Sequence, residues 1–158
     1  MKISTKGRYA LRLAIDVAQR QGNGPVSLRE VSERQGFSAK YIEQLASLLM
    51  RAGILSSVRG AHGGYTLKGD PSAITAGDVL RASEGSTAPV ACLEDDFGVC
   101  PMRSQCSTIS FWEGLDQAIE SYVDSVTLAD LAAQPLAEGD CCEMEVNLDE
   151  SSVGVPTS

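Results

Sequence analysis

The chain has 158 residues, five of them cysteines, and its formal net charge of −8 would exclude a nucleic-acid partner if that charge were spread evenly. No stretch approaches the roughly 20 apolar residues that span a bilayer, and basic residues interrupt the N-terminal segment, so we expect neither a membrane span nor a signal peptide. We therefore expect a cytoplasmic protein, in which cysteines serve metal binding or redox chemistry more often than structural disulfides.

The charges are divided between two halves of the chain. Residues 1–68 contain 11 Lys and Arg against 4 Asp and Glu, a net charge of +7. Residues 69–158 contain 2 Lys and Arg against 17 Asp and Glu, a net charge of −15. This asymmetry indicates a module that binds a polyanion, joined to a part with another role.

Two helices are predicted at the start of the basic half. The first covers residues 5–19, where apolar side chains recur at helical spacing. Ser27 and Glu30 have the spacing of a capping box, which predicts a short second helix that ends near Gln35. Gly36 is then expected to adopt the left-handed conformation that ends many helices.

A third helix and a β-hairpin complete the basic half. Ser38 is expected to cap the helix, and residues 54–58 and 65–67 have the composition of strands. The glycine-rich segment 59–64 predicts a tight turn between them. The fold class is therefore mostly α with a small β-hairpin wing, and residues 1–84 are expected to form a winged helix-turn-helix domain.

Two further capping boxes are predicted in the acidic half. Thr75 and Asp78 open a helix that ends near Ser83, and Thr127 and Asp130 open a last short helix. These two helices would flank the cysteine-containing part of the chain.

A cysteine-containing loop and a long helix are expected between those two helices. Residues 85–107 lack any periodicity and form the predicted sensor loop, whereas residues 108–135 contain the long helix, for which Ser110 and Glu113 are the predicted capping box. One face of this helix carries Trp112, Leu115, Ile119, Tyr122 or Val123, and Val126. Such a face needs a partner surface, from a second copy or from its own domain. Residues 136–158 are expected to be an acidic, disordered tail.

The predicted DNA contacts follow from where a reading helix meets the duplex. Its first turns face base edges in the major groove, where Lys40 can reach guanine, Gln44 adenine and Glu43 a cytosine amine. Arginine at the base of the wing suits a narrow minor groove, and residues that begin the first helix contact phosphates. The candidate contacts are Lys2, Thr5, Arg8, Ser38, Lys40, Tyr41, Glu43, Gln44, Arg59, Gly60, His62 and Gly63.

Three of these residues have a structural alternative. Tyr41 can equally pack beneath its helix, and Glu43 can be a solvated helix residue. His62, the only histidine, is expected to be an exposed wing residue rather than a metal ligand.

The segments MKISTKGRYAL, PVSLREVSERQGFSAKYIEQL and SVRGAHGGYTL resemble the bacterial regulator family of IscR, CymR and NsrR. The resemblance continues through ITAGDVLRASEG and FWEGLDQAIESYVDSVTLADL, and so covers about residues 1–133. It implies a homodimer, in which the long C-terminal helix is the dimerisation helix and crosses its partner's. It also implies binding to double-stranded DNA at a pseudo-palindromic operator.

Three cysteines lie in the predicted sensor loop. Cys92, Cys100 and Cys106 can converge on an iron–sulfur cluster, although three scattered thiols can also be inert. Their spacing lacks the Cys-x-x-Cys pairs of a zinc site. In the IscR- and NsrR-like members three cysteines of this loop hold a cluster, so the resemblance implies that these three are metal ligands.

The sequence departs from that family at the fourth ligand. The IscR-like pattern has a histidine where this chain has Ile109, and the NsrR-like pattern has a carboxylate where it has Arg8. Neither residue can bind iron. The fourth ligand stays open, as does the choice between a [2Fe–2S] and a [4Fe–4S] cluster. The candidates are a serine, an external thiol, Glu94, Asp95, Asp96, Cys141 and Cys142.

The predicted function is a homodimeric transcriptional regulator, a repressor, that senses iron–sulfur or redox status through the loop cysteines. The alternative is a cluster-free, CymR-like regulator of cysteine metabolism that acts with cysteine synthase. A thiol redox enzyme is not expected, because the chain has neither a Cys-x-x-Cys on a βαβ pattern nor a nucleophile paired with a general base. A protein-interaction module that does not bind DNA is a further alternative, which salt-dependent duplex binding would exclude.

Overall fold

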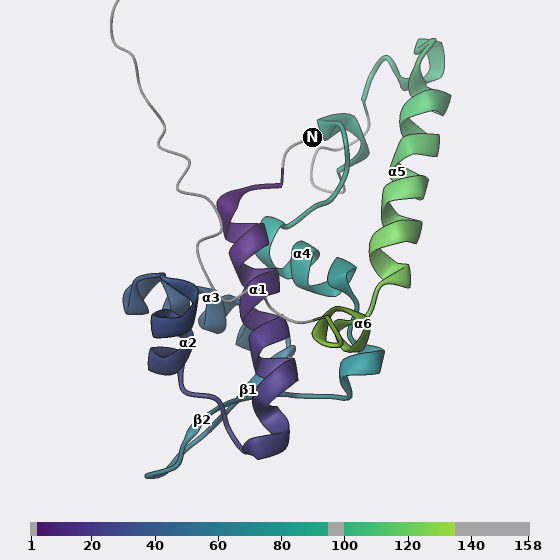
Figure 1. The fold of residues 1–158 in the computed structure, drawn as a ribbon. Coiled ribbons are helices and arrows are strands. Elements are labelled where there is room, and N and C mark those ends of the chain that lie inside the picture. The colour runs from purple at the N-terminus through teal and green to yellow at the C-terminus, as the bar shows by residue number, and fades with distance from the viewer. Residues whose placement is uncertain (1–2, 95–99, 135–158) are drawn as a thin grey trace, which may run out of the picture.

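The computed structural model describes residues 3–94 and 100–134 (Figure 1). The predicted fold class is confirmed, since helices dominate and the only sheet among these residues is a two-stranded antiparallel hairpin. The elements are α1 (Thr5–Arg20), α2 (Leu28–Gln35), α3 (Ala39–Arg51), β1 (Leu55–Val58), β2 (Gly64–Leu67), α4 (Ala76–Glu84), α5 (Ile109–Ser125) and α6 (Leu128–Ala132). None of the helices in the described part is long and apolar enough to cross a bilayer.

Helix α1 is the centre of the molecule. It packs against α3, α4 and α6, while the hairpin projects from one end of the body (Figure 1). Its buried apolar residues recur at helical spacing, and burial of each large side chain stabilises the fold by about 1.5–3 kcal/mol. The largest fully buried apolar side chains are Leu13, Val17, Val31, Ile42, Leu45, Leu49, Val79 and Leu128.

Helix α2 begins differently from the prediction. The side chain of Ser27 makes no capping hydrogen bond, so the predicted capping box with Glu30 is wrong. The reason is that the Glu30 carboxylate lies 3.8 Å from the Arg34 guanidinium, one turn further along the same helix. The end of the helix is as predicted, because Gly36 has a φ of 71° in the left-handed region.

Helix α3 and the hairpin follow the prediction closely. The Ser38 hydroxyl accepts a hydrogen bond from the Tyr41 backbone N–H at 3.3 Å and so caps α3. In the hairpin, Leu55 pairs with Leu67 and Val58 pairs with Gly64. Val26 adds an isolated bridge to Tyr65, and a Cβ at Gly64 would lie only 2.6 Å from the Val26 carbonyl oxygen. Glycine at this position therefore lets the wing join the body.

Helices α4 and α6 both begin with complete capping boxes, as predicted. The Thr75 hydroxyl accepts from the Asp78 N–H, and the Asp78 carboxylate accepts from the Thr75 N–H. Thr127 and Asp130 repeat this arrangement. Leu128 is fully buried against the core, and the Gln19 side-chain amide donates to the carbonyl oxygens at the end of α6. The chain thus returns to α1 after α5.

Helix α5 stands apart from the body (Figure 1). None of its seventeen residues, all of which are described, is buried. It begins at Ile109, and the predicted capping box of Ser110 and Glu113 is wrong because Ile109 is already helical. The Glu113 carboxylate instead accepts a hydrogen bond of 2.6 Å from Arg103, in the preceding loop.

Candidate nucleic-acid interface and cysteine loop

The first turns of α3 present polar side chains to solvent. Ser38, Lys40, Glu43 and Gln44 are exposed, whereas the other face of the helix is buried in the core. The helix is therefore fixed by its apolar side and free to meet a duplex with the polar side. These four residues are the predicted base and phosphate contacts of the major groove.

Aromatic side chains hold the turn before α3 against α1. The rings of Tyr9 and Phe37 are 4.0 Å apart at their centroids, and Tyr41 packs edge-on against Tyr9 at 6.0 Å. The Arg12 guanidinium lies 5.0 Å from the centroid of the Phe37 ring. Tyr41 is half-buried and its pKa is raised, first by that burial and then by the neighbouring Tyr9 and Glu84. In this structure Tyr41 therefore packs beneath its helix.

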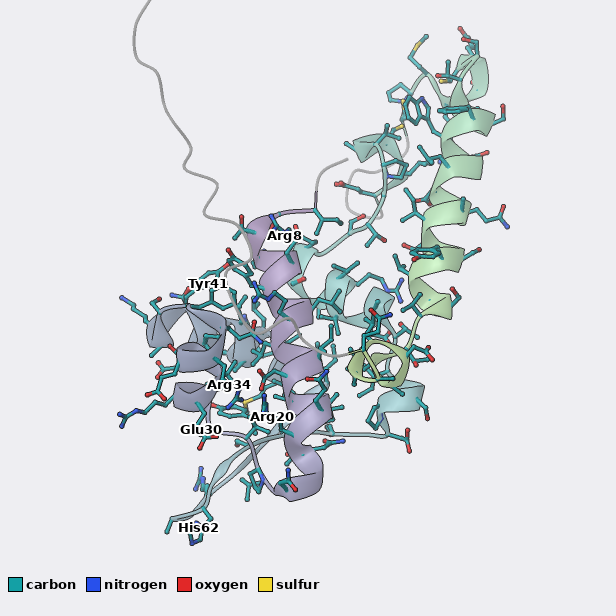
Figure 2. The ribbon with its side chains drawn as sticks, in the orientation of Figure 1. Arg8, Arg20, Glu30, Arg34, Tyr41 and His62 are labelled. Atoms are coloured by element: carbon teal, nitrogen blue, oxygen red, sulfur yellow. The ribbon has the colours of Figure 1, made fainter. Side chains whose placement is uncertain are left out.

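A buried carboxylate joins α1 to α2. The Asp16 side chain is completely buried and accepts hydrogen bonds from Arg34 at 2.5 Å and from Gln35 at 3.1 Å. The Arg20 Nε atom lies 3.4 Å from the same carboxylate. Figure 2 shows Arg20 and Arg34 close together where α1 faces α2. This ion pair fixes the first helix of the helix-turn-helix on the body.

The buried position of Asp16 was not predicted from the sequence. Its signal is a carboxylate on the apolar face of the first helix, three residues after Leu13 and next to Val17. A charge at such a position is rarely buried unless it is paired. The partner, Arg34, lies 18 residues away, and no local pattern connects the two.

The N-terminus of α1 is attached to the end of α4. The Glu84 carboxylate accepts hydrogen bonds from the Ser4 hydroxyl at 2.6 Å and from the Gly7 N–H at 2.8 Å. A Cβ at Gly7 would collide with the same oxygen, so glycine permits this contact. The predicted phosphate contacts Thr5 and Arg8 are exposed beside it. Lys2 lies outside the described residues.

The wing and the start of α1 lie far apart on the molecule. Figure 2 shows His62 at the tip of the hairpin, far from Arg8, with Tyr41 between them. Arg59, Gly60 and His62 are exposed, and Gly63 is half-buried. Gly60 has a φ of 123°, which only glycine adopts readily, so it permits the tight turn. The exposed residues of α3, the wing and the start of α1 together form the candidate nucleic-acid interface.

The three loop cysteines are free thiols, all half-buried. Cys106 Sγ lies 3.4 Å from the Thr108 hydroxyl, and this hydrogen bond, with backbone N–H groups of Thr108 and Ile109, lowers the pKa of the Cys106 thiol. Beside the loop is a cavity of about 310 Å³ whose lining includes Glu84 and Glu94. Thiolates are the donors that iron–sulfur clusters take, so the loop fits such a group in donor chemistry.

The described residues do not form a complete metal site. Within residues 3–94 and 100–134, no group of three or more His, Cys, Asp or Glu side chains lies close enough together to hold a metal ion. Ile109 is an apolar residue at the start of α5. Four of the candidate fourth ligands, Asp95, Asp96, Cys141 and Cys142, lie outside the described residues, as does the whole of the predicted acidic tail, residues 136–158. The cysteines thus fit a cluster in kind, but they are not brought together in this conformation.

The chain is similar in sequence and in structure to known bacterial regulators. The sequence profile of the Rrf2 family, described as an iron-dependent transcriptional regulator, matches residues 3–134. The regulator CymR of Bacillus subtilis is 44% identical over 133 residues, which cover 84% of this chain and 91% of the relative. Its solved structure, described as the global cysteine regulator, superposes with a TM-score of 0.70 and covers 84% of this chain and 97% of that one.

Proteins named IscR are similar to the same extent. IscR of Yersinia pestis is 41% identical over 131 residues, which cover 83% of this chain and 79% of the relative. The solved structure of T. potens IscR has a TM-score of 0.66 at 41% identity and covers 88% of this chain and 94% of that one. The similarity therefore spans both the helix-turn-helix and the long helix that follows the cysteine loop.

Proposed function

The chain belongs to the Rrf2 family of DNA-binding transcriptional regulators, and we propose that it acts as a homodimeric repressor that binds a pseudo-palindromic operator and senses iron–sulfur status. One observation carries this proposal. A loop that contains three cysteines lies between the exposed polar face of α3, with Ser38, Lys40 and Gln44, and the exposed helix α5. The polar face of α3 would read DNA, α5 would dimerise, and the loop between them would sense.

Exposed apolar side chains on α5 support the dimer. Phe111 is 63% exposed and Tyr122 is 71% exposed, on a helix that buries no residue within its own chain. Large apolar side chains that gather on one exposed helix favour association, because association removes them from water. A second copy of the same helix would cover them in a closed, two-fold arrangement.

The sensing proposal is supported by the contacts at the two ends of the loop. Thr87, which is buried near the start of the loop, donates a hydrogen bond to Glu120 of α5. Arg103, near its end, binds Glu113 of the same helix. A bound cluster would supply iron that reacts with oxidants, and the fraction of protein that holds a cluster would depend on the iron supply. Cys92, Cys100 and Cys106 would hold it, and a change in the loop would then reach α5 through these two contacts.

Anaerobic purification with visible spectroscopy and assays for iron and sulfide tests the sensing proposal. We expect a coloured protein, and a colourless one when Cys92, Cys100 and Cys106 are all replaced by alanine. A variant with Cys141→Ala and Cys142→Ala tests whether the fourth ligand comes from the tail: loss of iron would indicate that one of the two binds the cluster, and retained iron that neither does. Protein that stays colourless and free of iron after reconstitution would contradict cluster sensing while leaving DNA binding intact.

A cluster-free regulator of cysteine metabolism is the second candidate. It is favoured by the 44% identity to CymR, whose solved structure is described as that of a global cysteine regulator. In this case cysteine synthase would be the partner protein. Iron-free protein that co-purifies with the synthase and binds DNA would favour this function over cluster sensing.

The wing and the start of α1 are predicted to contribute differently to DNA binding. Arg59→Ala should weaken binding by about 1–3 kcal/mol on a duplex with a narrow, A·T-rich minor groove and less on a G·C-rich one. Arg8→Ala should weaken both equally and lower the slope of log K against log salt by about one, because it removes one phosphate contact. Fluorescence anisotropy with both duplexes at several salt concentrations measures this.

The control for these variants is Arg51→Ala, at the exposed C-terminal end of α3, away from the reading turns. It should change neither the affinity nor the salt dependence by more than a small factor. Equal losses for Arg59→Ala on the two duplexes would argue against minor-groove reading by the wing.

A further inference from the structure

In the described part of the chain, one arginine makes the side-chain hydrogen bonds that join α4 to α5. Arg81 of α4 donates hydrogen bonds of 2.6 Å to Glu120 and of 2.6 Å to Asp124, which are one helical turn apart on α5. Its Nη2 atom also lies 3.5 Å from Asp78, on its own helix. We call the winged helix-turn-helix part, residues 3–84, the reading domain. One guanidinium therefore joins three carboxylates at the junction between the reading domain and the long helix α5.

Residues around Arg81 allow this close approach. A Cβ at Gly77, in the first turn of α4, would collide with the Asp124 carboxylate and the Arg81 guanidinium, so glycine leaves room for this ion pair. The Thr75 hydroxyl donates to the same carboxylate at 3.4 Å. Glu120 uses its second oxygen to accept from Thr87, which connects the start of the cysteine loop to this cluster.

Among the described residues, backbone hydrogen bonds join α5 to the helices of the N-terminal part only at its C-terminal end. The Ala76 N–H donates to the Val126 carbonyl at 2.8 Å, and the Leu128 N–H donates to the Ile74 carbonyl at 2.8 Å. Two such bonds at one end locate α5 but leave it free to tilt about that point. The bonds of Arg81 to Glu120 and Asp124 lie further along the helix, where they oppose that tilt.

The two faces of α5 have different partners. At about 100° per residue, Tyr122 lies about 160° around the helix from both Glu120 and Asp124. The carboxylates thus face the reading domain of the same chain, while the exposed apolar residues face away from it. If a second copy covers the apolar face of α5, the angle between α5 and its own reading domain then sets how the two reading domains are oriented in the dimer.

We propose that Arg81 is a positioning residue that fixes the angle between the reading domain and α5, and so determines which half-site spacing the dimer accepts. This inference rests on the proposed function as a dimeric DNA-binding regulator. Arginine is needed because its planar guanidinium can bind two carboxylates at once, which a lysine ammonium does with poorer geometry. Without it, three carboxylates repel one another across the junction.

A distance measurement tests the angle without DNA. Nitroxide labels would be placed at Lys40 in α3 and Gln117 in α5, both exposed, through unnatural amino acids that leave the native cysteines unchanged. Labelled chains would be mixed with an excess of unlabelled chains, so that each dimer holds one labelled subunit. Pulsed EPR should give one narrow distance distribution for the native protein and a clearly broader one for Arg81→Met. Arg81→Lys should lie between them.

Measurement of DNA affinity tests which half-site spacing the dimer accepts. A duplex selected by the native protein from a random pool would be compared with duplexes whose half-sites are one or two base pairs closer or further apart. The native protein should lose about tenfold or more per altered base pair, whereas Arg81→Met should vary by less than about threefold while still binding a single half-site. The matched control is Arg29→Met, which removes an exposed ion pair within α2 that does not involve α5, and it should keep the native spacing preference.

The outcomes separate the two proposals. A folded Arg81→Met protein with a narrow distance distribution, or with native spacing preference, would overturn the role of Arg81. If Arg81→Met unfolds, as circular dichroism would show, Arg81→Lys and Glu120→Gln must show the broadening, and native distributions in both would overturn it. If the native protein selects no duplex, the proposed function fails, while the EPR comparison still decides whether Arg81 fixes the angle.

Discussion

Replacing Asp16 by alanine is expected to lower the free energy of unfolding by about 3–5 kcal/mol, because it removes the buried acceptor that Arg34, Gln35 and Arg20 share. Asp16 is completely buried, and Arg34, whose side chain is 28% exposed, donates two of its hydrogen bonds to it. Removing one member of a buried ion pair costs more than removing the pair, since the remaining charge keeps its desolvation penalty. Urea denaturation followed by circular dichroism measures the change.

A matched control for Asp16 is Glu33→Ala. Glu33 binds Arg29 at 3.0 Å in α2, but both side chains are largely exposed, so its loss should cost no more than about 0.5 kcal/mol. Asp16→Asn adds a second comparison, because it keeps the shape and removes the charge. A cost below about 1 kcal/mol for Asp16→Ala would mean that the buried carboxylate does not hold α2 on α1.

Tyr122→Glu is expected to dissociate the proposed dimer and, with it, to abolish tight operator binding. A carboxylate introduced into an apolar interface must lose its hydration without gaining a partner. A penalty of about 3–4 kcal/mol corresponds to a dimer dissociation constant raised on the order of 10² to 10³-fold. Analytical ultracentrifugation over a range of protein concentrations, together with anisotropy on the selected duplex, measures both effects.

Gln117→Glu is the control that carries the same charge on the same helix. Gln117 is exposed and lies about 140° around α5 from Tyr122, so its side chain projects away from the apolar face. It should leave the dimer and the affinity unchanged within a small factor. A Tyr122→Glu protein that stays dimeric at low concentration would show that the apolar face of α5 is not the interface.

Local hydrogen bonds explain which element boundaries could be predicted. The capping boxes of Thr75 with Asp78 and of Thr127 with Asp130 were predicted correctly, because each bond closes within four residues. The left-handed turn at Gly36 has a similarly local cause. The spacing of a capping box was misleading where the glutamate binds a cation instead of the backbone. Glu113, for example, binds Arg103. A long side chain binds the best partner within reach, and tertiary contacts decide which that is.

The residues of the candidate nucleic-acid interface also differ in whether local sequence or tertiary contacts decide their positions. Exposure of Ser38, Lys40, Glu43 and Gln44 followed from the apolar periodicity of α3, which buries the opposite face. Tyr41 could not be assigned in this way, because its position depends on Tyr9 of another helix. The cysteine loop has no periodicity, so its sequence shows which donor atoms are present but not how they are arranged in space.

The sequence by itself determined the fold class, the exposed polar face of α3, the glycine-tipped wing and the apolar face of the long helix. These features depend on hydrophobic periodicity, on charge and on hydrogen bonds between neighbours in the chain. Only the tertiary structure decided the roles of Asp16 and Arg81, whose partners lie 18 to 43 residues away. The physical reason is that an ion pair needs two groups within a few ångströms, and the packing of α1, α2, α4 and α5 creates that proximity.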